Sequence, residues 1–390
     1  MEELVTICQE RPSRRGGLRI VGRAMMNGNT VRACCRKGAR VIVLIGLLSG
    51  ISMYPALGKE SKRAVPYGMS VPFGQFAVPP RTRVILNNLA AGRYNPLGLV
   101  NQTRFGVQWV LYRRDSPLLR QNFAFAGALL KFTPTSSQIG GVVALAPVSV
   151  FRVQSALEWL HYYRVLDSFQ SFGGAEDDYA DGAVTARTAD KLSYASSGLR
   201  LTLSPVVQLR LPVGSFRENG APRFYLALRN VLSMMYHRMH TTYSDRADGR
   251  RDPVWYSSAL DTLVPALGWI LQNRLDLLLQ TRFRLWLGVS YTIVRPLYSR
   301  SSFRTPEAAN AYHNDNGHQR LGPLLAFRFF DRAFTRFNQP TIMIIANWYL
   351  SHRWKGGAET SRAIPYLLIG FSFQMDLLQP GNPTVSEPSF

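Results

Sequence analysis

The chain has 390 residues, of which 46 are Lys or Arg and 24 are Asp or Glu, giving a formal net charge of +22. A soluble protein this basic suggests nucleic acid, but the basic residues stand singly along apolar stretches and do not gather in a tail or on one helix. We therefore expect no nucleic-acid partner, and an anion or a lipid headgroup fits that distribution.

The first predicted element is a cleaved signal peptide. Arg36, Lys37 and Arg40 precede the apolar run VIVLIGLLSGI over 41–51, which is well short of the roughly 20 residues that a membrane-spanning helix requires. A proline then ends the run before the small-x-small sequence ALG, so we place the cleavage after Gly58. A short buried helix of a cytosolic domain is the alternative interpretation of this run.

The predicted leader, 1–58, differs in composition from the chain that follows it. It holds all three cysteines, so the mature chain has neither a disulfide framework nor a cysteine zinc site. It also holds nine basic and three acidic residues, which leaves 37 and 21, a net charge of +16, after its removal. Its basic cluster stands unusually far from the first residue, which a translation start at Met25 or Met26 would explain. We expect a linker over 59–80 before the folded part.

The folded part is predicted to consist of amphipathic strands. In the clearest one, over 365–377, large apolar residues such as Ile369 and Phe371 alternate with small or polar ones such as Gly370 and Ser372. Period-two alternation indicates a strand, and about 9 to 11 residues suffice for a tilted strand to cross a bilayer. In chain order, the predicted strands cover 81–97, 104–113, 121–133, 138–147, 152–163, 197–211, 223–237, 267–280, 282–294, 321–331, 341–352 and 365–377, with 254–263 as the alternative to the first.

Strand length favours a membrane barrel over a soluble β-sandwich, whose strands are typically about five or six residues long. Aromatic residues also gather near the segment ends, as interfacial girdles require. Long connections over 164–196, 238–266, 295–319 and 353–362 alternate with shorter ones, so we assign the long ones to the extracellular side. The predicted fold is all-β, a transmembrane antiparallel up-and-down β-barrel of about 12 strands (roughly 10 to 14) over 81–378, with a tail over 379–390.

The last predicted strand carries a short motif, GFSFQM, in which Gly370 is followed three and five residues later by Phe373 and Met375. With the signal peptide and the strand pattern, it resembles the terminal β-signal of Gram-negative outer-membrane proteins, which the barrel-assembly machinery reads. The resemblance implies export to a bacterial outer membrane, with the lipid bilayer and lipopolysaccharide as partners. The residues 378–390 depart from the pattern, because such barrels usually end on the aromatic residue itself.

Arginines on the polar parity of the predicted strands are the candidate functional residues. If the apolar parity faces lipid, nine arginines line the lumen: Arg104, Arg152, Arg200, Arg210, Arg229, Arg274, Arg282, Arg284 and Arg328. Acidic residues of the same parity are fewer, chiefly Glu158, Asp276 and Asp376. Such a lining favours anions, as basic rings do in anion and phosphate pores. The alternative is a salt-bridged filling of an occluded lumen, which bulky inward residues such as Trp286 and Phe330 favour.

Enzymatic chemistry has little support in the sequence. Ser155 and His161 share one face of a strand but stand roughly 20 Å apart, so a site would need a partner on an adjacent strand. The acidic loop 176–181 lacks the spacing of a calcium-binding loop, and we expect no metal, no cofactor and no catalytic residue. The predicted role is structural, ligand-binding or passive passage of anions or small solutes. The alternatives are an outer-membrane lipid-modifying hydrolase and a secreted basic β protein that binds polyanions.

Overall fold

The computed structural model describes residues 81–378, except 113–115, 117, 120–121, 167, 191, 217–221, 242–248, 282, 313–314, 331–335 and 356–362. All described residues belong to one compact unit, Val65–Phe390. The predicted leader with its cleavage after Gly58, the linker over 59–80 and the tail over 379–390 lie outside the described residues and stay predictions.

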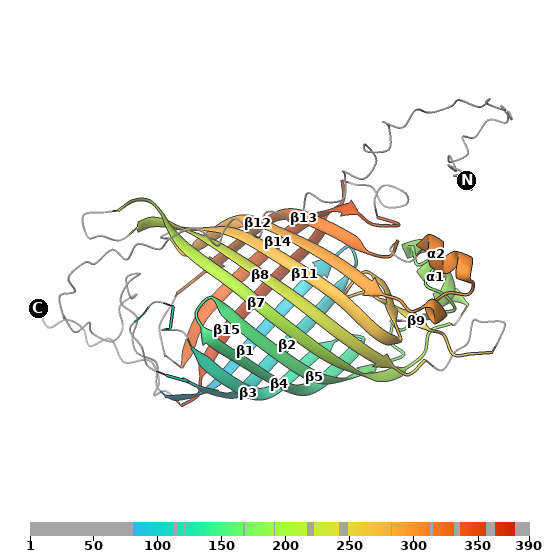
Figure 1. Ribbon diagram of the computed structural model, residues 1–390, viewed down its shortest axis with the longest axis horizontal. Helices are drawn as coiled ribbons and strands as arrows, with labels where there is room; N and C mark the ends of the chain where they lie inside the picture. The colour runs from blue at the N-terminus through green and yellow to red at the C-terminus, as the bar shows by residue number, and fades with distance from the viewer. Residues whose placement is uncertain are drawn as a thin grey trace, which may run out of the picture. The chain divides into compact units, whose positions relative to one another are not determined.

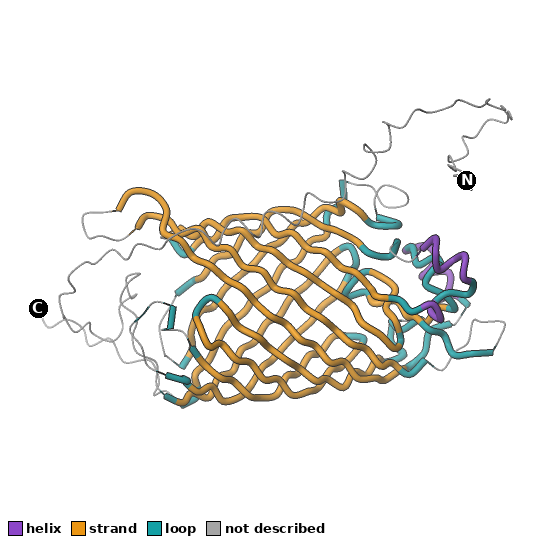
Figure 2. Tube along the Cα trace, in the orientation of Figure 1, coloured by secondary structure: helices purple, strands orange, loops and turns teal. Residues whose placement is uncertain are grey.

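Twelve antiparallel strands form one closed barrel. Figure 1 and Figure 2 show how the tilted strands run around its wall. They are β1 (Thr82–Tyr94), β2 (Gly98–Trp109), β3 (Phe123–Thr133), β4 (Ser136–Val148), β5 (Phe151–Tyr162), β7 (Ser196–Phe216), β8 (Pro222–Met239), β11 (Leu267–Thr281), β12 (Leu285–Leu297), β13 (His318–Arg328), β14 (Phe337–Ser351) and β15 (Tyr366–Asp376). Successive barrel strands pair, and β1 pairs with β15, so the barrel has no open edge. The prediction of a twelve-strand antiparallel barrel is confirmed.

The alternation in the sequence becomes the two faces of the barrel wall. In β12, Leu287 and Val289 are 40 % and 45 % exposed, whereas Ser290 is 1 % exposed. The register continues this sorting into the adjacent strands, because Ser290 pairs with Asp276 on β11 and with Gly322 on β13. Exposed leucine, valine, isoleucine and aromatic side chains cover the outward face. That face is the apolar band that the hydrocarbon core of a membrane requires.

Two of the predicted strands need correction. The strand expected over 104–113 is β2, which begins six residues earlier at Gly98 and ends at Trp109. The alternative strand over 254–263 is not part of the barrel, since its residues form β9 (Val254–Ser257) and β10 (Thr262–Pro265), which join β6 (Ser171–Phe172) in a separate three-stranded sheet. All residues of β9 and β10 are buried, so their apolar side chains meet other parts of the protein and not lipid.

The four long connections predicted from the sequence all leave the same end of the barrel, and we call them together the cap. They follow β5, β8, β12 and β14, and they hold the small sheet together with α1 (Asp181–Ala189), η2 (Arg300–Ser302) and α2 (Pro306–Tyr312). Figure 1 shows α1, α2 and β9 at this end. Phe172, Val254, Leu263 and Tyr298 form the core of the cap. Within the described residues, no helix is long and apolar enough to cross a membrane.

Candidate functional site

Charged side chains of the barrel strands are sorted by face. Following the register from the buried Glu158, and counting only strand residues whose side chains the structure describes, eleven basic side chains lie on the lumen face with only three acidic ones. The basic residues are Arg83, Arg93, Arg104, Lys131, Arg152, Arg200, Arg210, Arg229, Arg274, Arg320 and Arg328, and the acidic ones are Glu158, Asp276 and Asp376. Sequence reasoning missed Arg83, Arg93, Lys131 and Arg320, although the same period-two parity would have found them.

All three lumenal carboxylates are paired. Glu158 is 1 % exposed and lies between Lys131 Nζ, at 2.7 Å, and Arg200 Nη2, at 2.9 Å. Asp276 accepts hydrogen bonds from Arg274 Nε at 2.8 Å and from the Ser290 hydroxyl at 2.7 Å. Arg83 Nε donates to Asp376 at 2.7 Å, which joins β1 to β15 where the barrel closes. This part of the lumen agrees with the expected salt-bridged filling.

A second group of lumenal arginines is not paired in this way. Arg104, Arg152 and Arg229, which we call the arginine arc, lie close enough for each to interact electrostatically with the next. Within the described residues, Arg152 and Arg229 have no hydrogen-bond or ion-pair partner, and Arg229 is exposed to the lumen. Arg104 lies with its guanidinium 5.1 Å from the centre of the Phe125 ring. The arc therefore presents three cationic groups to the lumen, and the Asp276 carboxylate beside Arg229 is already paired with Arg274.

The remaining predicted arginines fall in three environments. Arg210 lies 4.2 Å from the centre of the Tyr225 ring, and Arg328 lies 4.9 Å from that of Trp286. Arg284 is not on a strand, because it occupies the turn before β12 with φ +63° and donates to the Phe329 carbonyl at 2.6 Å. Arg282 lies outside the described residues. Phe330, expected to point inward, comes after the end of β13.

Cap side chains close one end of the lumen. Trp255 of β9 and Phe169 are 1 % and 0 % exposed, and their rings stack with centroids 5.3 Å apart. They belong to one apolar cluster with Leu160 of β5, Met235 of β8 and Ile270 of β11, all on the lumen face. The lumen is therefore filled at the cap end by residues of the long connections. The sequence held no signal for this, because it does not show toward which side a long loop folds.

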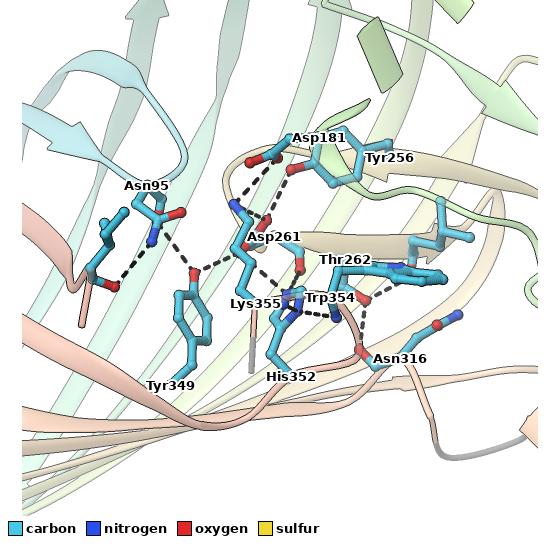
Figure 3. A network of polar contacts seen from close by, with 12 residues as sticks. Asn95, Asp181, Tyr256, Asp261, Thr262, Asn316, Tyr349, His352, Trp354 and Lys355 are labelled. Atoms are coloured by element: carbon cyan, nitrogen blue, oxygen red, sulfur yellow. Dashed lines mark hydrogen bonds and ion pairs between the residues drawn. The ribbon is translucent and has the colours of Figure 1, made fainter. Parts of the chain in front are cut away.

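A buried polar network around Asp261, in the turn between β9 and β10, fastens the cap to the barrel (Figure 3). Tyr256 and Tyr349 donate their hydroxyls to the Asp261 carboxylate at 2.9 Å and 2.5 Å. His352 Nδ1 accepts the backbone N–H groups of Trp354 and Lys355, which leaves the ring proton on Nε2, 3.3 Å from Asp261. The Lys355 ammonium is also 3.3 Å from this carboxylate.

The contacts of Asp261 determine its charge. Burial alone raises the pKa of a carboxyl group, but the His352 hydrogen bond and the Lys355 charge outweigh it and hold the pKa of Asp261 well below its usual range. Asp261 is therefore an anion that four side chains from three segments share. Sequence reasoning missed this network because its members are up to 99 residues apart, from Tyr256 to Lys355, and share no motif.

The motif residues of the last strand lie on both faces of β15. Gly370 is on the lumen face, while Phe373 and Met375 point outward and pair with residues of β1 and β14. The Phe373 ring is 5.3 Å from that of Phe337 on β14. This placement fits a signal displayed on the membrane side of the terminal strand, and its recognition by the assembly machinery stays a prediction.

The residues considered for chemistry lie on the outside of the barrel and in the cap. His161 Nδ1 is 2.7 Å from the Ser197 hydroxyl on the adjacent strand, and not near Ser155. In the acidic loop 176–181, Asp177 pairs with Arg304 at 2.9 Å, so the loop is engaged within the cap. Within the part of the chain that the structure describes, no group of three His, Cys, Asp or Glu residues could hold a metal ion.

Comparison with known proteins gives an architectural likeness. No family model and no curated protein matches the chain. The NanC porin matches with TM-score 0.30 and 8 % identity, over 75 % of this chain and 100 % of that chain. The translocator domain of autotransporter NalP from Neisseria meningitidis matches with TM-score 0.33 and 11 % identity, over 75 % of this chain and 87 % of that chain. The outer-membrane protein OprD from Pseudomonas aeruginosa matches with TM-score 0.25 and 6 % identity, over 79 % of this chain and 95 % of that chain. In class, the chain resembles the β-barrels of bacterial outer membranes.

Proposed function

We propose that the protein is an integral outer-membrane barrel whose lumen binds small anions and lets them pass when the cap loosens. The arginine arc is the observation that carries this proposal. Arg152 and Arg229 hold like charges near one another, and the neighbouring Asp276 carboxylate is already bonded to Arg274 and Ser290. Like charges in a partly dry interior cost free energy unless an anion or water lies between them. Basic rings of this kind select anions in other pores.

Salt-bridged filling, the competing role for the same arginines, accounts for only part of the lumen. It fits Arg200 and Arg274, which pair with Glu158 and Asp276. It gives no partner to Arg152 or Arg229, and it leaves the exposure of Arg229 unexplained. Because Trp255 and Phe169 fill the cap end, we infer that the resting barrel conducts poorly.

The proposed orientation follows the usual asymmetry of bacterial barrels, in which the long connections are extracellular. The cap then faces the outside, and the ends of the barrel segment, at β1 and β15, face the periplasm. In this proposal the chain is exported with its signal peptide, and the barrel-assembly machinery reads β15 through Phe373 and Met375. The bilayer and lipopolysaccharide surround the inserted barrel.

Reversal potentials in planar bilayers under a KCl gradient test the anion path. We expect a small anion-selective current from the wild type, and a larger current of the same selectivity from Trp255→Ala, which removes the indole from the cap end. Replacing both Arg152 and Arg229 with glutamate in the Trp255→Ala background should shift selectivity toward cations. Arg300→Glu, an exposed cap residue, is the charge-matched control and should change nothing. Unchanged selectivity in the double glutamate variant would contradict the proposal.

A lipid-modifying hydrolase is a second candidate function, and one contact favours it. His161 and Ser197 form a 2.7 Å pair on the outward face near the cap end of β5 and β7, where lipid esters are within reach. A serine beside a base is the core of a nucleophilic site. Within the described residues, however, no carboxylate hydrogen-bonds to the His161 ring, which stacks on Trp159 and meets Tyr163 edge-on. The dyad therefore lacks an orienting group.

Release of fatty acid from phospholipid micelles by the purified protein tests this second function. If the dyad is catalytic, Ser197→Ala should abolish release. Ser155→Ala should not, because Ser155 also faces outward on β5 but lies six residues from His161, nearer the middle of the barrel. Release that is absent from the wild type, or equal in the two variants, would remove the hydrolase hypothesis. Neither result bears on the anion path, because both serines lie outside the lumen.

A further inference from the structure

The outward face of the barrel carries almost no charge. Among the described residues of the twelve barrel strands, only Arg238 and Arg295 are charged and point outward, and no Asp or Glu does. Both arginines are exposed, and neither has a hydrogen-bond or ion-pair partner among the described residues. A charged side chain on the lipid face costs free energy at mid-membrane but little near the headgroups. The position of each arginine along its strand therefore decides whether it destabilises the inserted barrel or can contact lipid headgroups.

The two arginines lie together at the cap end. Arg238 is the last residue but one of β8, which ends at Met239, and Arg295 is the third from last of β12, which ends at Leu297. Only β11 lies between these strands, which puts about two interstrand spacings, roughly 10 Å, between them. Arg238 pairs with Leu267 of β11 and Arg295 with Leu271, so the two arginines are also offset by about 13 Å along the strands, and roughly 16 Å separates their backbones. Arginine side chains are long enough for both guanidinium groups to reach one headgroup that lies over β11 between them.

An aromatic residue occupies the strand between them. Trp269 of β11 points outward, is 41 % exposed, and pairs with Tyr236 of β8 and Leu297 of β12. Its ring lies 5.1 Å from that of Tyr236. Tryptophan and tyrosine take up the level of the lipid headgroups, because their rings are apolar and their polar ends are wet. The pair therefore marks the headgroup level at this side of the barrel.

We propose that Arg238 and Arg295, with Trp269 between them, bind the phosphorylated headgroup of a glycolipid in the outer leaflet. Guanidinium groups bind phosphate with two parallel hydrogen bonds, and the described strands offer no outward carboxylate to compete for them. A sugar headgroup that carries phosphates on both sides matches two cations that flank an aromatic surface, with roughly 16 Å between their backbones. The outer-leaflet assignment rests on the orientation in the proposed function, whereas the phosphate chemistry does not.

Native mass spectrometry of the purified full chain in detergent, titrated with bisphosphorylated lipid A, tests the site. We expect the wild type to retain one lipid, Arg238→Gln and Arg295→Gln each to weaken retention about tenfold, and the double variant to bind no better than the wild type binds dephosphorylated lipid A. Arg300→Gln removes the same charge from the exposed cap surface and should behave as the wild type. Equal retention by the double variant and the wild type would overturn the proposal.

Two further probes separate the sources of phosphate. If phosphatidylglycerol is retained as tightly as lipid A, the glycolipid assignment is wrong. If inorganic phosphate at millimolar concentration displaces lipid A completely, the site is one for soluble anions and the proposal is also wrong. Bilayer selectivity of the same double variant should stay at the wild-type value, because both arginines are outside the lumen. Failure of lipid binding and failure of the anion path are therefore distinguishable.

Discussion

Glu158 illustrates how single residues support a basic lumen. Its buried carboxylate is placed between Lys131 and Arg200, and Arg200 also donates to the side chain of Gln138 at 2.6 Å. One anion thus compensates two cations on β3 and β7 and holds four strands together through side chains. Parity in the sequence placed Glu158 and Arg200 on one face, but it could not show that they meet, because that depends on the register between β5 and β7.

Replacing this anion should be costly. Glu158→Gln keeps the size of the side chain but leaves Lys131 and Arg200 without their counter-charge, and breaking a buried ion pair costs about 3–5 kcal/mol. We expect a loss of that order in the free energy of unfolding, measured by urea titration in lipid vesicles. Asp190→Asn, at an exposed position after α1, is the control and should change it by less than about 0.5 kcal/mol. Equal effects of the two substitutions would contradict the pairing.

Asp261 makes the cap sensitive to acid. Its folded pKa is depressed below the unfolded value of about 3.9, so the carboxylate stabilises the folded cap fully above about pH 5, and this contribution is lost as the pH falls toward the folded pKa. We expect the cap to become susceptible to pepsin only well below pH 4. Asp261→Asn should make the cap susceptible at a higher pH, where the wild type resists. Cleavage with the same pH dependence in both proteins would rule out this role of Asp261.

At the level of the elements, the strands of the barrel could be predicted well from the sequence, and the elements of the cap could not. Alternation located β15 and β12, because one face of each meets lipid and the other the lumen. The same apolar alternation made 254–263 an alternative strand of the barrel, although β9 and β10 are buried in the cap. Hydrophobicity predicts that a side chain is shielded from water, but it does not distinguish a side chain that faces lipid from one that is buried in protein.

Arginine substitutions on β14 and β15 test which face meets lipid. Phe371 and Ile344 are exposed on the outward face, whereas Ser372 faces the lumen. Charge at the lipid midplane costs about 2–4 kcal/mol, so Phe371→Arg and Ile344→Arg should fold in vesicles with much lower yield than Ser372→Arg. The yield is measured by the shift in gel mobility between folded and heated protein. Equal yields for the three variants would mean that the facing is reversed.

The whole molecule combines an apolar outer face, a basic lumen and a cap that fills one end. The outer face and the excess of lumenal arginine could be predicted from the strand pattern, since both follow from parity. The cap could not, because Trp255 meets Phe169 and Asp261 meets His352 only when three long connections fold together. Which lumenal arginines are paired with carboxylates could not be predicted from the sequence either, since it depends on which side chains meet across the lumen.

Membrane fractionation of cells that express the chain tests the central claim, an integral outer-membrane barrel, most directly. We expect the protein to sediment with the outer membrane, to resist extraction by urea and alkaline carbonate, and to enter solution only with detergent, because its outward side chains are apolar around the whole barrel. Recovery of the folded protein in the soluble fraction without detergent would contradict the account.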